Sequence, residues 1–170
     1  YFSGTFDGRG HTLKAKVAEQ GIFGGFYDGT TIKNTKFVLE FSDKTESCGL
    51  AGNNGTFNLW GGSVVLSNLN VETVNYFKNS YALLGYCNFN LEMYDIYVNI
   101  NGTESLPDYA SVGVESEMAA LFHYDLTSTM ASNDGKFKGR FRNIFVVTGK
   151  FMPIACCYWR YGSYRYVSYA

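Results

Sequence analysis

The feature that most limits the fold of this chain is an internal repeat built from two short units. The first unit reads apolar, any, Asn or Asp, mostly apolar, any, apolar, and it occurs at residues 32–37, 66–71, 93–98 and 141–146. The second unit is small and apolar and precedes each copy of the first, at residues 21–24, 49–52, 83–85 and 120–122, with 154–156 as the start of a fifth copy. It recurs every 28 to 37 residues, a period typical of repeat architectures.

Two short strands alternating at this period are typical of a β-solenoid. A single coil cannot bury its apolar face, so neighbouring coils must stack, about 4.8 Å apart as strands do in a sheet. The sequence therefore predicts an all-β fold, a right-handed parallel β-helix (β-solenoid) of roughly four to five irregular coils. We expect residues 1–170 to form a single solenoid segment, a fragment of a longer protein.

The local sequence signals agree with this prediction. Apolar and polar residues alternate at 68–74 and at 94–100, and Asx-Gly dipeptides recur along the chain, which indicates short strands joined by tight turns. No long window carries the apolar spacing and the caps of a helix. The unequal repeat lengths place the extra residues in loops, expected at 53–62, 101–116 and 125–136.

Each copy of the first unit contains one Asn or Asp that we interpret as a structural repeat anchor. Such a side chain bonds to the backbone at a bend, or to the equivalent side chain of the next coil. The four anchors are Asn34, Asn68, Asp95 and Asn143.

Composition excludes several classes of protein. Apolar residues make up 46% and charged residues 17% of the chain, which supports a packed core rather than disorder. The longest apolar run, at residues 151–159, is far shorter than the about 20 residues of a spanning helix. The four cysteines form no CxxC pair, so a zinc ribbon is not expected, and no metal or other cofactor is predicted.

The opening segment, residues 2–13, reads FSGTFDGRGHTL and is followed by GIFG and then by IKNT. This series resembles the β-solenoid segments of bacterial cell-surface proteins of the F-x-G-x-F-D-G-x-G-H-T-I type, which accompany GLUG-like repeats and share the architecture of pectate-lyase-like right-handed β-helices. The resemblance covers residues 1–41 closely and the later repeats loosely. The resemblance implies an extracellular or cell-surface location. The proteins of this type include adhesins, stalk domains and carbohydrate-active enzymes.

Catalytic signatures are weak. A glycosidase needs two carboxylates about 5–10 Å apart across the bond. No motif surrounds the acids that could pair, and no clustered acids suggest the Ca²⁺ site of a lyase. His11 is expected in a turn, and His123 is expected at a strand end beside Asp125. The carboxylate pairs considered are Glu92 with Asp95 and Glu115 with Glu117.

Charge is unevenly distributed along the chain. Residues 135–170 contain seven basic and no acidic side chains, against seven basic and fifteen acidic ones in residues 1–134. Alternation within residues 136–142 places four cations on one strand face and Phe137 and Phe141 on the other, inward face. Two interpretations stay open: a solvated strand whose charge guards against edge pairing, and a contact surface for an anionic glycan. The four cations are Lys136, Lys138, Arg140 and Arg142.

The aromatic stretch at residues 158–166 adds Trp159 and Arg160 as candidate glycan contacts, because rings stack on sugar faces and Arg binds carboxylates. A core strand is the simpler interpretation of the same stretch.

The first functional hypothesis is a non-catalytic adhesin or stalk module that presents loops and binds an anionic polysaccharide or a host or cell-wall glycan. The alternatives are a fragment of a carbohydrate-active β-helix enzyme (polysaccharide lyase or glycoside hydrolase) and a purely structural spacer. Nucleic acid is not an expected partner, since most of the chain is acidic, and no membrane span is expected. Neighbouring coils or domains of the same longer chain are further expected partners.

Overall fold

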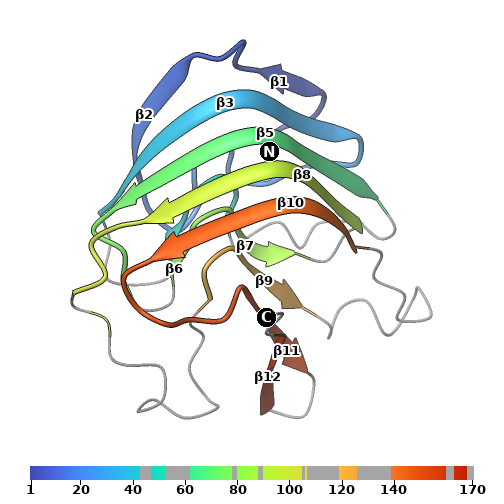
Figure 1. Cartoon of the computed structure of the whole chain (residues 1–170). Helices are drawn as coiled ribbons and strands as arrows, with labels where there is room; N and C mark the ends of the chain where they lie inside the picture. The colour runs from blue at the N-terminus through green and yellow to red at the C-terminus, as the bar shows by residue number, and fades with distance from the viewer. Residues whose placement is uncertain are drawn as a thin grey trace.

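The computed structural model describes residues 1–42, 47–52, 62–77, 80–87, 90–104, 106, 119–125, 139–159 and 163–167. Over these residues the chain forms strands and no helix, so the all-β prediction is confirmed. The described strands belong to three sheets, of which the largest curves around the others (Figure 1).

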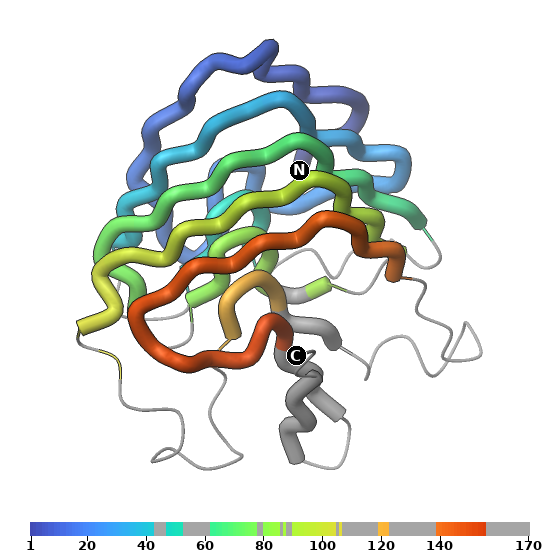
Figure 2. The backbone as a smooth tube through the Cα atoms, in the orientation of Figure 1, coloured from blue at the N-terminus to red at the C-terminus, as the bar shows by residue number. Residues whose placement is uncertain are grey.

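All strand pairs of the main sheet are parallel. Its strand order is β1-β3-β5-β8-β10, and β2 also pairs with β3, farther along that strand than β1. Figure 2 shows the successive strands following one another down the sheet in chain order. The strands are β1 (Thr5–Asp7), β2 (Thr12–Val17), β3 (Thr30–Phe41), β5 (Ser63–Val74), β8 (Asn90–Ile100) and β10 (Gly139–Thr148).

The remaining strands form two smaller sheets. In the second sheet β7, β9 and β11 run parallel, and β12 is antiparallel to β11 and ends the sheet. The third sheet is the single parallel pair β4–β6. Their bounds are β4 (Ser47–Cys48), β6 (Ser80–Tyr81), β7 (Leu84–Cys87), β9 (Phe122–Asp125), β11 (Ala155–Trp159) and β12 (Ser163–Val167).

The main sheet buries one face because apolar residues stay in register from strand to strand. Ile32, Leu66 and Met93 are successive partners on β3, β5 and β8, and all three are buried. Phe37, Val71 and Val98 form a second buried row on the same strands. Side chains alternate between the faces of a strand, so a one-residue slip would expose every row at once.

The second repeat unit forms the opposite wall of the core. Backbone amides of Leu50, Leu83 and Leu121 donate to carbonyls of the next copy at 2.8, 3.0 and 2.9 Å. These three side chains are fully buried in the main apolar cluster. The unit that recurs in sequence therefore recurs in space as a stack.

The expected loops fall largely outside the described residues. Only residues 62, 101–104, 106 and 125 of the three loop ranges belong to the described part.

Candidate functional site

The four anchors occupy one bend of the main sheet, where the backbone of each is left-handed. The φ angles are +54° at Asn34, +49° at Asn68, +56° at Asp95 and +56° at Asn143. Asn and Asp tolerate this conformation better than other side chains that have a Cβ. The bend shifts the alternation by one residue, so that Ile32 and Thr35 on either side of Asn34 are both buried.

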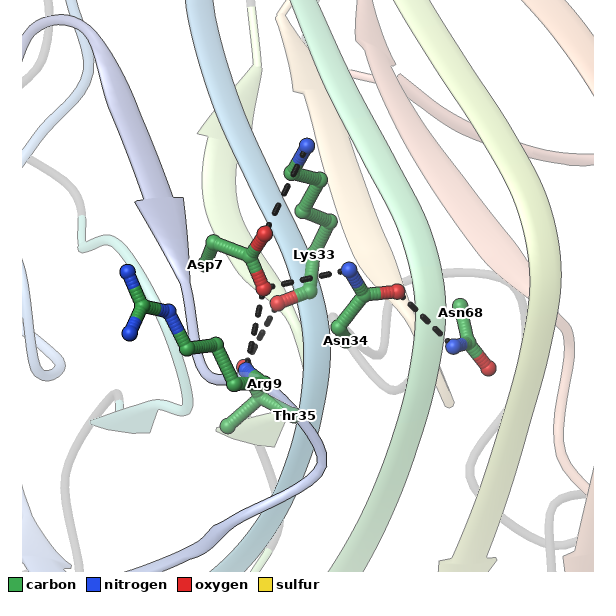
Figure 3. A network of polar contacts seen from close by, with 6 residues as sticks. All are labelled: Asp7, Arg9, Lys33, Asn34, Thr35 and Asn68. Carbon is green, nitrogen blue, oxygen red and sulfur yellow. Dashed lines mark hydrogen bonds and ion pairs between the residues drawn. The ribbon is translucent and has the colours of Figure 1, made fainter.

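Side-chain hydrogen bonds connect the anchors of neighbouring strands. Asn68 Nδ2 donates to Asn34 Oδ1 at 2.9 Å, and Asn34 Nδ2 donates to Asp7 Oδ1 at 3.1 Å (Figure 3). Farther along the sheet, Asn143 Nδ2 donates to Asp95 Oδ1 at 2.7 Å. We call this set of five side chains the Asx ladder, and each amide in it donates toward the preceding strand.

Asp7 is the first member of the Asx ladder and accepts its first hydrogen bond, from Asn34. Its Oδ1 also accepts the backbone amide of Arg9 at 2.9 Å, and Lys33 Nζ lies 3.6 Å from Oδ2 (Figure 3). The Arg9 amide and then the Asn34 amide hold the pKa of Asp7 below its ordinary value of 3.8. Hydrogen bonds to the charged form of a carboxyl have this effect. The carboxylate is thus occupied by contacts within the fold.

A polar and aromatic surface covers the outer face of β8 and β10. We call it the β8–β10 patch and define it as Glu92, Tyr94, Tyr97, Arg140, Arg142 and Phe145. The register places Arg140 beside Glu92, Arg142 beside Tyr94 and Phe145 beside Tyr97. The patch therefore consists of three cross-strand pairs in a row.

The first two pairs form a small charged cluster. Tyr94 Oη donates to Glu92 Oε2 at 2.6 Å, and Arg140 Nη1 lies 3.8 Å from Glu92 Oε1. The guanidinium of Arg142 lies 5.6 Å from the centre of the Tyr94 ring, within cation–π range. The hydrogen bond to Glu92 raises the pKa of Tyr94, which keeps the phenol protonated as a donor. Arg140 keeps 75% of its side chain exposed.

The third pair presents two aromatic rings to solvent. Tyr97 is 42% exposed and Phe145 is 62% exposed, and the two residues are cross-strand partners just beyond the anchors Asp95 and Asn143. Neighbouring exposed rings can serve as a contact surface for a ligand or another molecule. This is the feature of the patch that internal packing does not account for.

Sequence reasoning placed only part of this surface. It selected Arg140 and Arg142, but Tyr97 and Phe145 were not among the candidates. The sequence signal that could have found them is their position two residues after an anchor. Because the left-handed bend shifts the alternation by one residue, the side chain at this position lies on the outer face, as Asn70 does on β5.

The other proposed contacts are not brought to this patch by the described structure. Lys136, Lys138 and Arg160 lie outside the described residues. Trp159 ends β11, which belongs to the second sheet rather than the main one, and only its backbone is described. Phe141 pairs in register with buried Met93, and its ring centre lies 6.0 Å from that of Phe122, as expected for the inward face.

The two candidate carboxylates of the first pair, Glu92 and Asp95, make contacts with other side chains of the main sheet. Glu92 binds Tyr94 and faces Arg140, whereas Asp95 accepts from Asn143. His11 is exposed, and its backbone amide donates to Gly8 O at 2.8 Å. Glu115 and Glu117 lie outside the described residues, as do the side chains of His123 and Asp125. In the described part of the chain, no three His, Cys, Asp or Glu side chains gather as metal ligands would.

Comparison with known protein families, curated proteins and solved structures finds no match to this chain. Among the described residues, no helix has the length and apolar character needed to cross a membrane.

Proposed function

We propose that the chain is a right-handed parallel β-solenoid segment that acts as a non-catalytic module of an extracellular or cell-surface protein, an adhesin or stalk, and binds an anionic glycan. The chain-order stacking of parallel strands in the main sheet supports the solenoid. The β8–β10 patch supports the ligand class, through one observation: exposed aromatic rings and arginines share one strand face.

The chemistry of the patch suits a charged sugar polymer. The faces of Tyr97 and Phe145 offer an apolar surface on which the C–H face of a sugar ring can stack. Arg140 and Arg142 present guanidinium groups, which bind carboxylates and sulfates through paired N–H donors. The three pairs follow one another along β8 and β10. A sugar chain that contacts both the arginines and the rings would therefore run along these two strands and cross the bend at Asp95 and Asn143.

Glu92 affects how readily each arginine can bind an anion. It faces Arg140 at 3.8 Å, a distance too long for a strong hydrogen bond, and it holds the Tyr94 hydroxyl. An anionic ligand therefore competes with Glu92 for Arg140 but leaves the Tyr94–Glu92 bond in place. Arg142 has an aromatic ring rather than an acid as its cross-strand neighbour, so of the two arginines it is the better hydrogen-bond donor to an anion.

The test is binding to a panel of neutral and anionic polysaccharides, measured by affinity electrophoresis and by calorimetry with polygalacturonate and a sulfated glycan. The double variant Arg140→Glu and Arg142→Glu should abolish binding to the anionic members. The double variant Tyr97→Ala and Phe145→Ala should weaken it about tenfold or more, as loss of two stacked rings predicts. Lys14→Glu reverses an exposed charge on β2 of the same sheet, far from the patch in strand order, and serves as the control.

Each alternative has its own result. Unchanged binding by both double variants would contradict the assignment of the patch. Shortening of the polysaccharide during incubation would identify a carbohydrate-active enzyme, and the absence of any glycan binding would identify a structural spacer.

A further inference from the structure

A row of outward-facing side chains crosses the main sheet just beyond the bend. Its members are successive register partners on neighbouring strands, which Figure 1 shows side by side. Neighbouring strands lie about 4.8 Å apart, so the row forms a continuous surface. We call it the outer row, and from β2 to β10 it consists of Thr12, Lys36, Asn70, Tyr97 and Phe145.

Asn70 extends the β8–β10 patch onto β5. It is the register partner of Tyr97, and it is exposed between the buried residues Leu69 and Val71. No hydrogen bond of its side-chain amide is present among the described residues. Asn68, two residues earlier on the same strand, donates its own amide to the Asx ladder. The two exposed rings of the patch therefore have an exposed and unbonded amide beside them.

This set of groups suits a sugar ring that carries no charge. The rings of Tyr97 and Phe145 offer an apolar surface to the C–H face of the sugar. The amide of Asn70 has both donors and an acceptor, so it can bind hydroxyl groups at the edge of the same sugar. Ligand sites commonly combine a largely apolar surface with a few polar groups that fix the orientation of the ligand.

The charges around the outer row do not favour a carboxylate at this place. Lys36 is the cation of the row, and its Nζ lies 3.3 Å from Glu72 Oε2. Glu72 follows Asn70 by two residues on β5, so both side chains lie on the outer face. An anionic group beside Asn70 would meet this acid and would have to displace it from Lys36.

The arginines of the patch lie on the other side of the bend. On β10, Arg142 comes directly before the anchor Asn143, and Phe145 comes two residues after it. A strand rises about 3.3 Å per residue, which puts Arg142 and Phe145 at most about 10 Å apart. A short oligosaccharide can therefore contact the arginines with an anionic sugar and the rings with an uncharged one.

We propose that Asn70, Tyr97 and Phe145 form a subsite for one uncharged sugar ring, and that the ligand of the β8–β10 patch is a heteropolysaccharide in which an uncharged sugar is joined to an anionic one. This inference rests on the function proposed above, since the arginines must hold the anionic sugar. It adds Asn70 to the binding residues, and it makes a homopolymer of uronic acid the poorer ligand.

The test compares saccharides of equal charge by calorimetry. Tetrasaccharides of hyaluronan and of unsulfated chondroitin each carry two glucuronates and two uncharged N-acetylated sugars, whereas digalacturonate carries two carboxylates and no uncharged sugar. At least one tetrasaccharide should bind about tenfold more tightly than digalacturonate, the value of the ring contacts and one hydrogen bond.

A variant of Asn70 locates the effect. Asn70→Ala should weaken binding of the preferred tetrasaccharide about three- to tenfold, because the amide hydrogen bonds are lost, and should leave binding of digalacturonate unchanged. Thr12→Ala removes an exposed polar side chain at the far end of the outer row. It is the matched control and should alter the binding of neither ligand.

The failure of this inference can be told apart from the failure of the proposed function. Equal affinity for the tetrasaccharides and digalacturonate, or an equal loss for both in Asn70→Ala, would overturn the uncharged subsite and leave the arginine contact in place. Binding that survives the double variant Arg140→Glu and Arg142→Glu, or no binding of any of these saccharides, would overturn both. The comparison on the unaltered protein tests the subsite even if a variant fails to fold.

Discussion

At the scale of single residues, the Asx ladder contains a mismatch that simple counting reveals. Asp7 and Asp95 are acceptors only, and between them stand two amides, Asn34 and Asn68. From Asp7 to Asp95 there are three contacts between neighbouring side chains, and each needs one donor. The two amides each donate to one neighbour, so one contact is left without a hydrogen bond. The contact between Asn68 and Asp95 is the one without a hydrogen bond in the described structure.

The variant Asp95→Asn should therefore stabilise the protein. The new amide donates to Asn68 Oδ1 and still accepts from Asn143, so one hydrogen bond is added, worth about 1 kcal/mol. The loss of the charge-assisted bond from Asn143 offsets part of this gain. The measurement is chemical denaturation, in which the midpoint should rise with an unchanged m value.

The matched control for this prediction is Asn68→Asp. It removes the donor to Asn34 and places a carboxylate beside that of Asp95, so the midpoint should fall at neutral pH. If Asp95→Asn lowered the midpoint or left it unchanged, the counting argument would be wrong.

At the residue scale, the sequence predicted those features for which the residue type itself indicates a backbone conformation. The anchors were recognisable because Asn or Asp recurs at one place in the repeat, where a left-handed bend suits those side chains. The pair Tyr97 and Phe145 was not recognisable as a surface feature. The alternation of side chains predicts which face a residue lies on only as far as the next bend. At Asp95 and Asn143 the bend shifts the alternation by one residue, so the faces beyond it cannot be predicted by simple counting.

At the scale of elements, the second repeat unit depends on close approach of backbones. A Cβ at Gly49 would collide with the carbonyl group of Ala82, which lies beside the next copy of the unit. The amide of Gly49 donates to Tyr81 O at 2.9 Å, so the two segments cannot separate without losing a main-chain bond. A small residue here is a condition for stacking.

Gly49→Ala should consequently destabilise the protein by about 1–3 kcal/mol, the usual cost of overpacking. Gly149→Ala is the control: its Cβ would lie 3.1 Å from the Thr103 hydroxyl oxygen, a side-chain atom that can rotate away. The thermal midpoint of the control should change much less. Similar shifts for both variants would show that the Ala82 contact is not the cause.

The strands themselves were predictable where the repeat is regular. The copies of the first unit lie within β3, β5, β8 and β10, and the apolar positions that the unit requires face the core. The division of the opening segment into β1 and β2, both paired with β3, does not follow from the repeat, because it results from the turn between them. The antiparallel β12 also has no counterpart in the repeat, because the repeat predicts only parallel additions.

At the scale of the whole molecule, the long strands β5 and β8 each pair, among the described strands, only with the main-sheet strands before and after them. The stability of such a stack is a sum of nearest-neighbour contacts. A residue in the middle is covered from two sides, whereas its counterpart in the last strand is covered from one. The cost of the same truncation should therefore depend on the strand's place in the stack more than on the size of the side chain.

Leu66 and Phe141 test this dependence because both belong to one inward row. Leu66 on β5 is fully buried, and Phe141 on β10 is 44% exposed. Leu66→Ala should lower the free energy of unfolding by about 2–5 kcal/mol. Phe141→Ala removes more atoms but leaves no enclosed cavity, so its cost should be about half that or less. Equal losses in urea denaturation would mean that Phe141 is covered in solution as fully as Leu66 is.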